Sequence, residues 1–175
     1  MKNEQIEIKI TGIKPIILNG YVSKDDVNIP VEKKLNFDNG NIVITSERIM
    51  SFLIDNNPKL PSGCIKLFTE KKKYKDLIPK AKAYVAISPR IIPIAKKGDF
   101  VSREDKVGGG GVPNMIKRPM IENWEANFNI TLWENPDITF NKLKDWFDRG
   151  GIEVGLGAWR PFYGQFIVSK FEKKQ

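Results

Sequence analysis

Apolar and polar residues alternate with a period of two in several stretches of the chain, a pattern typical of half-buried β-strands. The clearest stretch is Trp124–Leu132, and Ile6–Ile10 shows the same alternation near the N-terminus. A third stretch, Ala83–Ile87, can be extended over residues 89–94, and Phe166–Val168 begins a last one. The pattern therefore predicts strands at the beginning, in the middle and at the end of the chain.

Two other segments place their apolar residues on one face of a helix. The first follows Thr45, which suits an N-cap, and ends before Asn56–Pro58. The second follows Thr139, and we expect Gly150–Gly151 to close it with a left-handed turn. The predicted apolar faces consist of Ile49, Phe52 and Leu53 in the first helix, and of Leu143, Trp146 and Phe147 in the second.

The remaining segments have weaker patterns. Ile16–Leu18 suits an edge strand, because Pro15 would be costly in a central strand. Residues 21–41 are polar and rich in turn formers, with Asn39–Gly40 as the expected tip of a hairpin. Residues 59–82 are harder to assign, and Gly63–Phe68 fits either a short strand or a turn.

The order of the predicted elements is β-α-β-β-α-β, which indicates an α+β protein with a ferredoxin-like, RRM-like topology. The length of 175 residues favours one domain covering residues 1–175. Residues 95–120 interrupt the pattern between the second and third strands, contain Gly108–Gly111, and have few large apolar side chains. We expect a long basic hairpin with a mobile tip there, with an ordinary disordered insertion as the alternative.

Composition excludes several classes of function. The chain has no histidine and a single cysteine, Cys64, so it lacks the usual zinc ligands, the usual general base and an internal disulfide. Its N-terminus is polar, and no apolar run has the length of a membrane span. We therefore expect a cytoplasmic protein with no membrane association, no metal and no cofactor.

Positive charge is concentrated in one third of the sequence. The net charge is +8, and residues 66–118 contain fourteen Lys and Arg against five Asp and Glu. The rest of the chain is nearly balanced, with fifteen basic and sixteen acidic residues. Such a concentration favours a polyanionic partner, with a solubilising surface as the alternative.

The segment Gly150–Val168 carries the most distinctive local chemistry, because it holds five of the fourteen glycines of the chain. Glycines allow positive φ angles and close backbone approach, while Trp159, Arg160 and Tyr163 offer faces for bases and a cation for phosphates. The alternative is a tight helix-to-strand connection in which Trp159 and Phe162 are core residues.

Three parts of the chain supply candidate contacts to a nucleic acid: the glycine-rich segment 150–168 (the glycine loop), the basic residues 95–120 (the excursion) and the start of the chain. None of them is predicted to be catalytic or to bind a metal. The candidates are Lys14, Asn19, Lys96, Lys97, Arg103, Lys106, Lys117, Arg118, Gly155, Gly157, Trp159, Arg160 and Tyr163.

Two motifs resemble those of the RAMP (repeat-associated mysterious protein) superfamily. One is the opening segment TGIKPIILNG at residues 11–20, and the other is GLGAWRP followed by YGQF at residues 155–161 and 163–166. The chain looks most similar to small, often phage-encoded relatives of the CRISPR effector backbone subunit. This resemblance implies an RRM-like core that binds single-stranded RNA, a thumb-like hairpin between the second and third strands, and several copies lined up along the RNA.

Three hypotheses follow. The first is a non-catalytic binder of single-stranded RNA, or less favourably of DNA, that assembles as a homo-oligomer or filament along the strand. The second is a metal-independent endoribonuclease using Tyr163 with Lys14 or Arg160. The third is a phage protein-binding module that interacts with or mimics CRISPR subunits through an exposed edge strand at Ile16–Leu18.

Overall fold

The computed structural model describes residues 2–18, 29–107 and 114–175 of the protein. Asn19 and the glycine-rich tip of the excursion therefore lie outside the described residues. The elements are β1 (Asn3–Gly12), β2 (Ile16–Ile17), the 3-10 helix η2 (Val31–Lys34), β3 (Asn36–Asp38), β4 (Asn41–Thr45), α1 (Ser46–Ile54), α2 (Cys64–Phe68), α3 (Tyr74–Tyr84), β5 (Val85–Ser88), β6 (Ile91–Lys96), β7 (Val101–Val107), β8 (Asn114–Ile121), β9 (Glu125–Trp133), α4 (Phe140–Glu153) and β10 (Phe166–Lys173).

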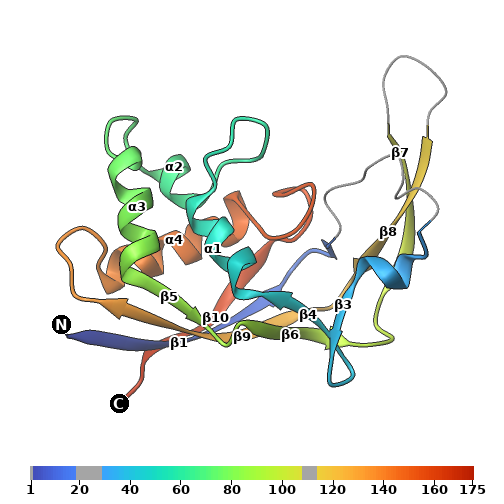
Figure 1. Ribbon diagram of the computed structural model, residues 1–175, viewed down its shortest axis with the longest axis horizontal. Coiled ribbons are helices and arrows are strands. Elements are labelled where there is room, and N and C mark those ends of the chain that lie inside the picture. The colour runs from blue at the N-terminus through green and yellow to red at the C-terminus, as the bar shows by residue number, and fades with distance from the viewer. Residues whose placement is uncertain (1, 19–28, 108–113) are drawn as a thin grey trace.

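A four-stranded antiparallel sheet in the order β10-β1-β9-β5 forms the centre of the molecule. The helices lie together on one face of this sheet (Figure 1). The alternation read from the sequence sets the burial, because Ile6, Ile8 and Ile10 of β1 are completely buried beneath the helices. Helices and antiparallel sheets together confirm the α+β class.

Aromatic rings hold α1 and α4 against the sheet. Phe52 of α1 lies 5.2 Å from Phe147 of α4 and 5.3 Å from Phe166 of β10, measured between ring centroids. Phe128 of β9 lies 5.9 Å from Phe147. These residues belong to one continuous core, so both predicted amphipathic helices bury the faces that the sequence assigned to them.

The predicted end of the second helix was wrong. Gly150 and Gly151 lie inside α4, which continues to Glu153. A Cβ atom on Gly150 would lie 2.4 Å from Cys64 Sγ, and one on Gly151 would lie 2.3 Å from the Phe166 carbonyl oxygen. These two glycines therefore allow α4 to pack closely on α2 and β10, and the left-handed turn is made by Gly155 instead, with φ of +68°.

Two three-stranded sheets flank the central one. The first has the order β3-β4-β6, and its β3–β4 turn at Asn39–Gly40 confirms the predicted hairpin. The stretch expected as strand over residues 83–94 begins with the last two residues of α3, Ala83 and Tyr84, and then forms two strands. Of these, β5 joins the central sheet, whereas β6 pairs with β4. The second has the order β2-β8-β7, and its β7–β8 hairpin rises at the end of the molecule opposite to α3 (Figure 1).

The expected edge strand at Ile16–Leu18 is not exposed. Ile16 and Ile17 are fully buried and pair with Ile121 and Met120 of β8. On the other side, the Ile17 carbonyl accepts a hydrogen bond from the Ala158 amide. This segment is therefore held between the hairpin and the glycine loop, and it offers no free edge to a partner.

The basic residues of the segment 66–118 lie in two separate regions of the fold. Gly63–Phe68 is neither a strand nor a turn, because α2 covers most of it, and α3 follows at Tyr74. The seven lysines between residues 66 and 82 lie in and around these two helices, on the side away from the hairpin (Figure 1). Only the basic residues after β5 reach the β6–β8 region. In the described part of the chain, every helix is too short or too polar to cross a membrane.

Candidate nucleic-acid interface

The part of the glycine loop between α4 and β10, residues 154–165, folds back on the start of the chain. Its backbone is held by hydrogen bonds from Ala158 N to Ile17 O at 2.7 Å and from Gly164 N to Pro15 O at 2.8 Å. A third bond, from Leu156 N to Gly164 O at 2.9 Å, closes the loop on itself. The two motifs that stand out in the sequence are therefore in direct contact.

Two glycines make this docking possible. Gly157 has φ of +83°, and a Cβ atom there would lie 2.5 Å from the Ile17 carbonyl oxygen. Gly164 has φ of +72°, and its Cβ would lie only 1.7 Å from the Leu156 carbonyl oxygen. A side chain at Gly157 would push the loop away from the 12–18 segment, whereas one at Gly164 would force apart the two ends of the loop itself. In both cases the obstructing atom is a backbone oxygen, which cannot yield as a flexible side chain can.

The glycine loop directs the Trp159 side chain toward solvent. Trp159 has a positive φ of +55°, which is uncommon for a bulky residue, and its exposed fraction is 43%. Phe162 is 69% exposed, and Tyr163 lies beside both rings. The alternative in which Trp159 and Phe162 belong to the core is therefore wrong, since the loop directs both rings away from it.

The β7–β8 hairpin places two arginines on this aromatic group. Arg103 Cζ lies 5.3 Å from the Trp159 ring centroid and 4.6 Å from that of Tyr163. Arg118 Cζ lies 4.8 Å from the Trp159 centroid. Arg103 and Arg118 are paired across the two strands, so both side chains extend from the same face of the hairpin. The hairpin and the glycine loop thus form one surface, which we call the clasp.

The clasp contains buried charge. Asp105, on the same hairpin face, accepts a 2.8 Å hydrogen bond from Arg103 Nε. Arg118 is only 5% exposed and Asp105 only 6%. Among the described residues, Asp105 Oδ2 and Arg118 Nε and Nη1 are buried without a hydrogen-bond partner.

Other candidate residues lie around the clasp. Lys14 is exposed, with Nζ 5.5 Å from the Phe162 ring centroid. Lys106 and Lys117 are exposed on the opposite face of the hairpin. There, Lys117 Nζ lies 3.7 Å from Glu104 Oε1, and the backbone carbonyl of Lys117 accepts a hydrogen bond from Lys34 Nζ. The hairpin therefore presents cations on both faces.

Lys96 and Lys97 lie apart from this group. Lys96 pairs with Asn41 at the end of β6, and the Lys97 amide donates to the Gly40 carbonyl. Lys97 Nζ lies 5.5 Å from the Phe37 ring centroid. Both lysines thus belong to the tip of the β3-β4-β6 sheet.

Arg160 is not the exposed residue that the sequence suggested. Its guanidinium donates to Asp55 at 2.7 Å and to the Pro61 carbonyl at 3.0 Å, and its side chain is only 8% exposed. Arg160 therefore ties the glycine loop to the segment after α1. Of the two pairings considered for an endoribonuclease, Tyr163 with Arg160 is not present, because the Arg160 guanidinium is held by Asp55 and Pro61. Lys14, the other candidate, lies over Phe162, whose ring is next to Tyr163.

A cavity of about 670 Å³ lies on the α1 side of the loop and is lined by Trp159, Arg160 and Arg48, among others. Arg48 is half-buried and donates to the Leu18 carbonyl at 3.3 Å. Burial, and then the nearby Arg160 charge, lower the pKa of the Arg48 guanidinium, so a bound anion would be favourable there. Sequence reasoning missed Arg48, because only the folding of the loop over α1 places it beside Trp159.

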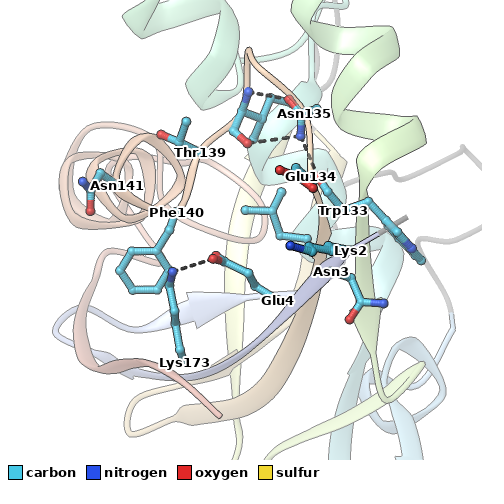
Figure 2. A pocket seen from close by; sticks show the side chains of 12 residues that line it. Lys2, Asn3, Glu4, Trp133, Glu134, Asn135, Thr139, Phe140, Asn141 and Lys173 are labelled. Carbon is cyan, nitrogen blue, oxygen red and sulfur yellow. Dashed lines mark hydrogen bonds and ion pairs between the residues drawn. The ribbon is translucent and has the colours of Figure 1, made fainter. Parts of the chain in front are cut away.

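A second cavity, of about 510 Å³, lies at the far end of the sheet, where α4 begins (Figure 2). Two of the charged residues that line it are paired with each other, since Lys173 bonds Glu4, and Lys173 also lies over the Phe140 ring. The Asn135 side chain bonds the backbone of its own turn. We assign no ligand to this cavity.

On the face of the central sheet that the helices do not cover, charged side chains also pair with one another. Lys9 pairs with Glu125 at 2.9 Å and Lys170 with Glu7 at 2.8 Å. The hydrogen bond from Lys170 is the main cause of the lowered pKa of Glu7. Side chains that already satisfy one another leave little on this face for a polyanion, so the clasp is the better candidate.

Comparison with known proteins shows that this protein resembles a solved structure in fold, without a match in sequence. No known family's sequence profile matches the chain, and no curated protein matches it. Among solved structures, it is similar to a chain in the "Cryo-EM structure of the Type III-B Cmr-beta bound to cognate target RNA", with a TM-score of 0.64 and 15% identity. The match covers 99% of this protein but 61% of that chain, so the protein spans less than two thirds of this neighbour.

Proposed function

We propose that this protein is a non-catalytic binder of single-stranded nucleic acid, with RNA preferred over DNA. The observation that carries the proposal is the clasp, in which basic residues of the hairpin meet the exposed aromatic rings of the glycine loop. Cations beside aromatic faces suit a single strand, because phosphates pair with the cations while unpaired bases stack on the rings.

Each residue has a role in this proposal. Trp159 and Tyr163 stack bases, and Lys14, Arg103, Lys106 and Lys117 neutralise phosphates. Gly155 is buried and Gly157 packs on the Ile17 carbonyl, so both act by shaping the loop that carries the rings. Arg48 holds a phosphate in the cavity behind the loop. Arg160 acts indirectly by fixing the loop, and Lys96 and Lys97 extend the basic surface toward the β3-β4-β6 sheet. Asn19 directly follows the buried residues Ile16–Leu18 in the sequence and is the remaining proposed contact.

The fold supports a relation to the RAMP superfamily. We interpret the strand order β10-β1-β9-β5, with helices between β1 and β5 and between β9 and β10, as a ferredoxin-like core with a thumb-like insertion before β9. The solved neighbour is, in its own description, a Cmr assembly bound to target RNA. By analogy, we propose that several copies of this protein line up along one strand.

Titration of a labelled single-stranded RNA at several salt concentrations tests the proposal. If Lys14, Arg48, Arg103, Lys106 and Lys117 each neutralise one phosphate, log K should fall with log salt at a slope of about −3.5. Lys106→Ala and Lys117→Ala should each reduce the slope by about 0.7, whereas Lys144→Ala on α4 serves as the control. Binding that is absent or independent of salt would refute the proposal, and equal affinity for DNA would refute the preference for RNA.

A further inference from the structure

The clasp contains hydrogen-bonding groups that nothing in the described protein satisfies. Arg118 and Asp105 are each more than nine-tenths buried, and Arg118 Nε, Arg118 Nη1 and Asp105 Oδ2 have no partner among the described residues. Buried polar atoms are almost always hydrogen-bonded, and an unpaired charged group is especially unfavourable. Two donors and one acceptor therefore lack partners, and a ligand that enters the clasp can reach them if it displaces Arg118.

These groups lie beside a surface suited to a flat ring. Arg118 covers one part of the Trp159 indole, with Cζ 4.8 Å from the ring centroid, and 43% of Trp159 remains exposed. A nucleobase is planar like a guanidinium and stacks on the same indole face. A base that takes this layer would displace Arg118 sideways, into the plane of the base and toward Asp105 on the same hairpin face.

We propose that the clasp reads a guanine base of the bound strand, with Trp159 stacking on the ring and with Arg118 and Asp105 contacting its edge. Guanine presents two adjacent acceptors, O6 and N7, which arginine contacts more often than any other base edge. Its N1–H donor lies next to O6, within reach of an acceptor such as Asp105 Oδ2. This inference rests on the proposed function and adds base selectivity to it.

Four 12-nucleotide RNAs test the inference: U12 and the repeats (UUG)4, (UUA)4 and (UUC)4. The (UUG)4 strand should bind about tenfold more tightly than U12, as expected for one arginine–guanine contact. Replacing guanosine by 7-deazaguanosine removes the N7 acceptor and should abolish most of this preference. Because the ligand is changed and the protein is not, this result does not depend on the folding of any variant.

Two variants assign the contact. Arg118→Lys and Asp105→Asn should each bring the ratio of (UUG)4 affinity to U12 affinity close to one. The ratio is the readout, because both residues belong to the clasp and their replacement also changes the affinity for U12. Matched controls are Arg149→Lys, whose guanidinium stacks on Phe68 at 4.0 Å, and Asp137→Asn, whose carboxylate pairs with Lys80; both should keep the preference.

The outcomes separate the two proposals. If all four RNAs bind equally, or if adenine or cytosine is preferred, guanine recognition is refuted and RNA binding stands. If none of them binds, both proposals are refuted.

Discussion

Trp159 is the central residue of the clasp, because its ring is exposed and contacts the arginines of the hairpin. Its backbone has positive φ, its ring is 43% exposed, and two arginines stack against it. Unfavourable backbone conformations persist only where the surroundings enforce them, and they are common at binding sites. Here the enforcement comes from the hydrogen bond between Ala158 and Ile17 and from the salt bridge between Arg160 and Asp55.

Trp159→Ala should therefore weaken RNA binding far more than it weakens the fold. Loss of one stacked base corresponds to about 1–3 kcal/mol of binding free energy. The loss of unfolding free energy should be well below the about 3–5 kcal/mol expected for a buried aromatic such as Phe147. Filter binding and urea denaturation of Trp159→Ala and Phe147→Ala measure both quantities. Unchanged RNA affinity in a folded Trp159→Ala protein would contradict the assigned role.

The Arg160–Asp55 pair fixes the loop, and its removal should be costly. Asp55→Ala leaves a nearly buried guanidinium without its carboxylate, and we expect a loss of about 3 kcal/mol in unfolding free energy. Replacing both partners, as in Asp55→Ala with Arg160→Met, should recover part of this loss because no unpaired charge remains. Urea denaturation provides the measurement. A double variant less stable than Asp55→Ala alone would show that the pair is not the cause.

At the scale of elements, glycine determines how closely helix α4 packs. Alanine is a better helix former than glycine by about 1 kcal/mol, so Gly150 inside α4 is unfavourable for the isolated helix. It is tolerated because Cys64 and Phe52 occupy the space that a Cβ would need, at 2.4 and 2.7 Å. Packing between elements therefore outweighs local helix propensity at this position.

Gly150→Ala should consequently destabilise the protein. Overpacking of a core costs about 1–3 kcal/mol, which exceeds the gain in helix propensity, so the net change should be a loss of up to about 2 kcal/mol. Gly98→Ala is the control, because nothing lies within 4 Å of its Cβ position. Chemical denaturation of both variants measures the change in unfolding free energy. A Gly150→Ala protein more stable than the unmodified one would show that α4 can shift to accommodate the Cβ atom.

At the scale of the whole molecule, the fold separates two basic regions and places the arginines of one of them, Arg103 and Arg118, on the exposed aromatic rings of the glycine loop. The lysines of α2 and α3 lie at one end of the molecule, whereas the hairpin rises at the opposite end and contacts the glycine loop (Figure 1). A strand bound at the clasp would thus meet one end of the molecule and leave the other end available for further copies.

Copies should accumulate as the strand lengthens. Light scattering with single-stranded RNAs of increasing length should show a stepwise rise in the number of protein molecules per strand, and the protein without RNA should scatter as a smaller species. Lys71→Ala, on the helical side, serves as the control and should bind as the unmodified protein does. A single copy on every strand length would contradict assembly along the RNA.

Much of the secondary structure could be predicted from the sequence because it depends on local patterns. The alternation in β1 and β9, the apolar faces of α1 and α4, and the Asn39–Gly40 turn are each set by neighbouring residues. The sequence could not show that α4 continues through Gly150–Gly151 or that residues 83–94 divide between the end of α3 and two sheets. Both depend on contacts with segments distant in sequence.

The composition of the candidate site was likewise visible in the sequence, as glycines, aromatic residues and a basic excursion. Only the tertiary structure decided which residues meet. Folding of the glycine loop onto residues 12–18 and of the hairpin onto Trp159 brought Arg103 and Arg118 to the aromatic rings, turned Arg160 inward and added Arg48. Local pattern fixes what each segment can contribute, whereas burial and charge pairing between distant segments fix which groups remain free to bind.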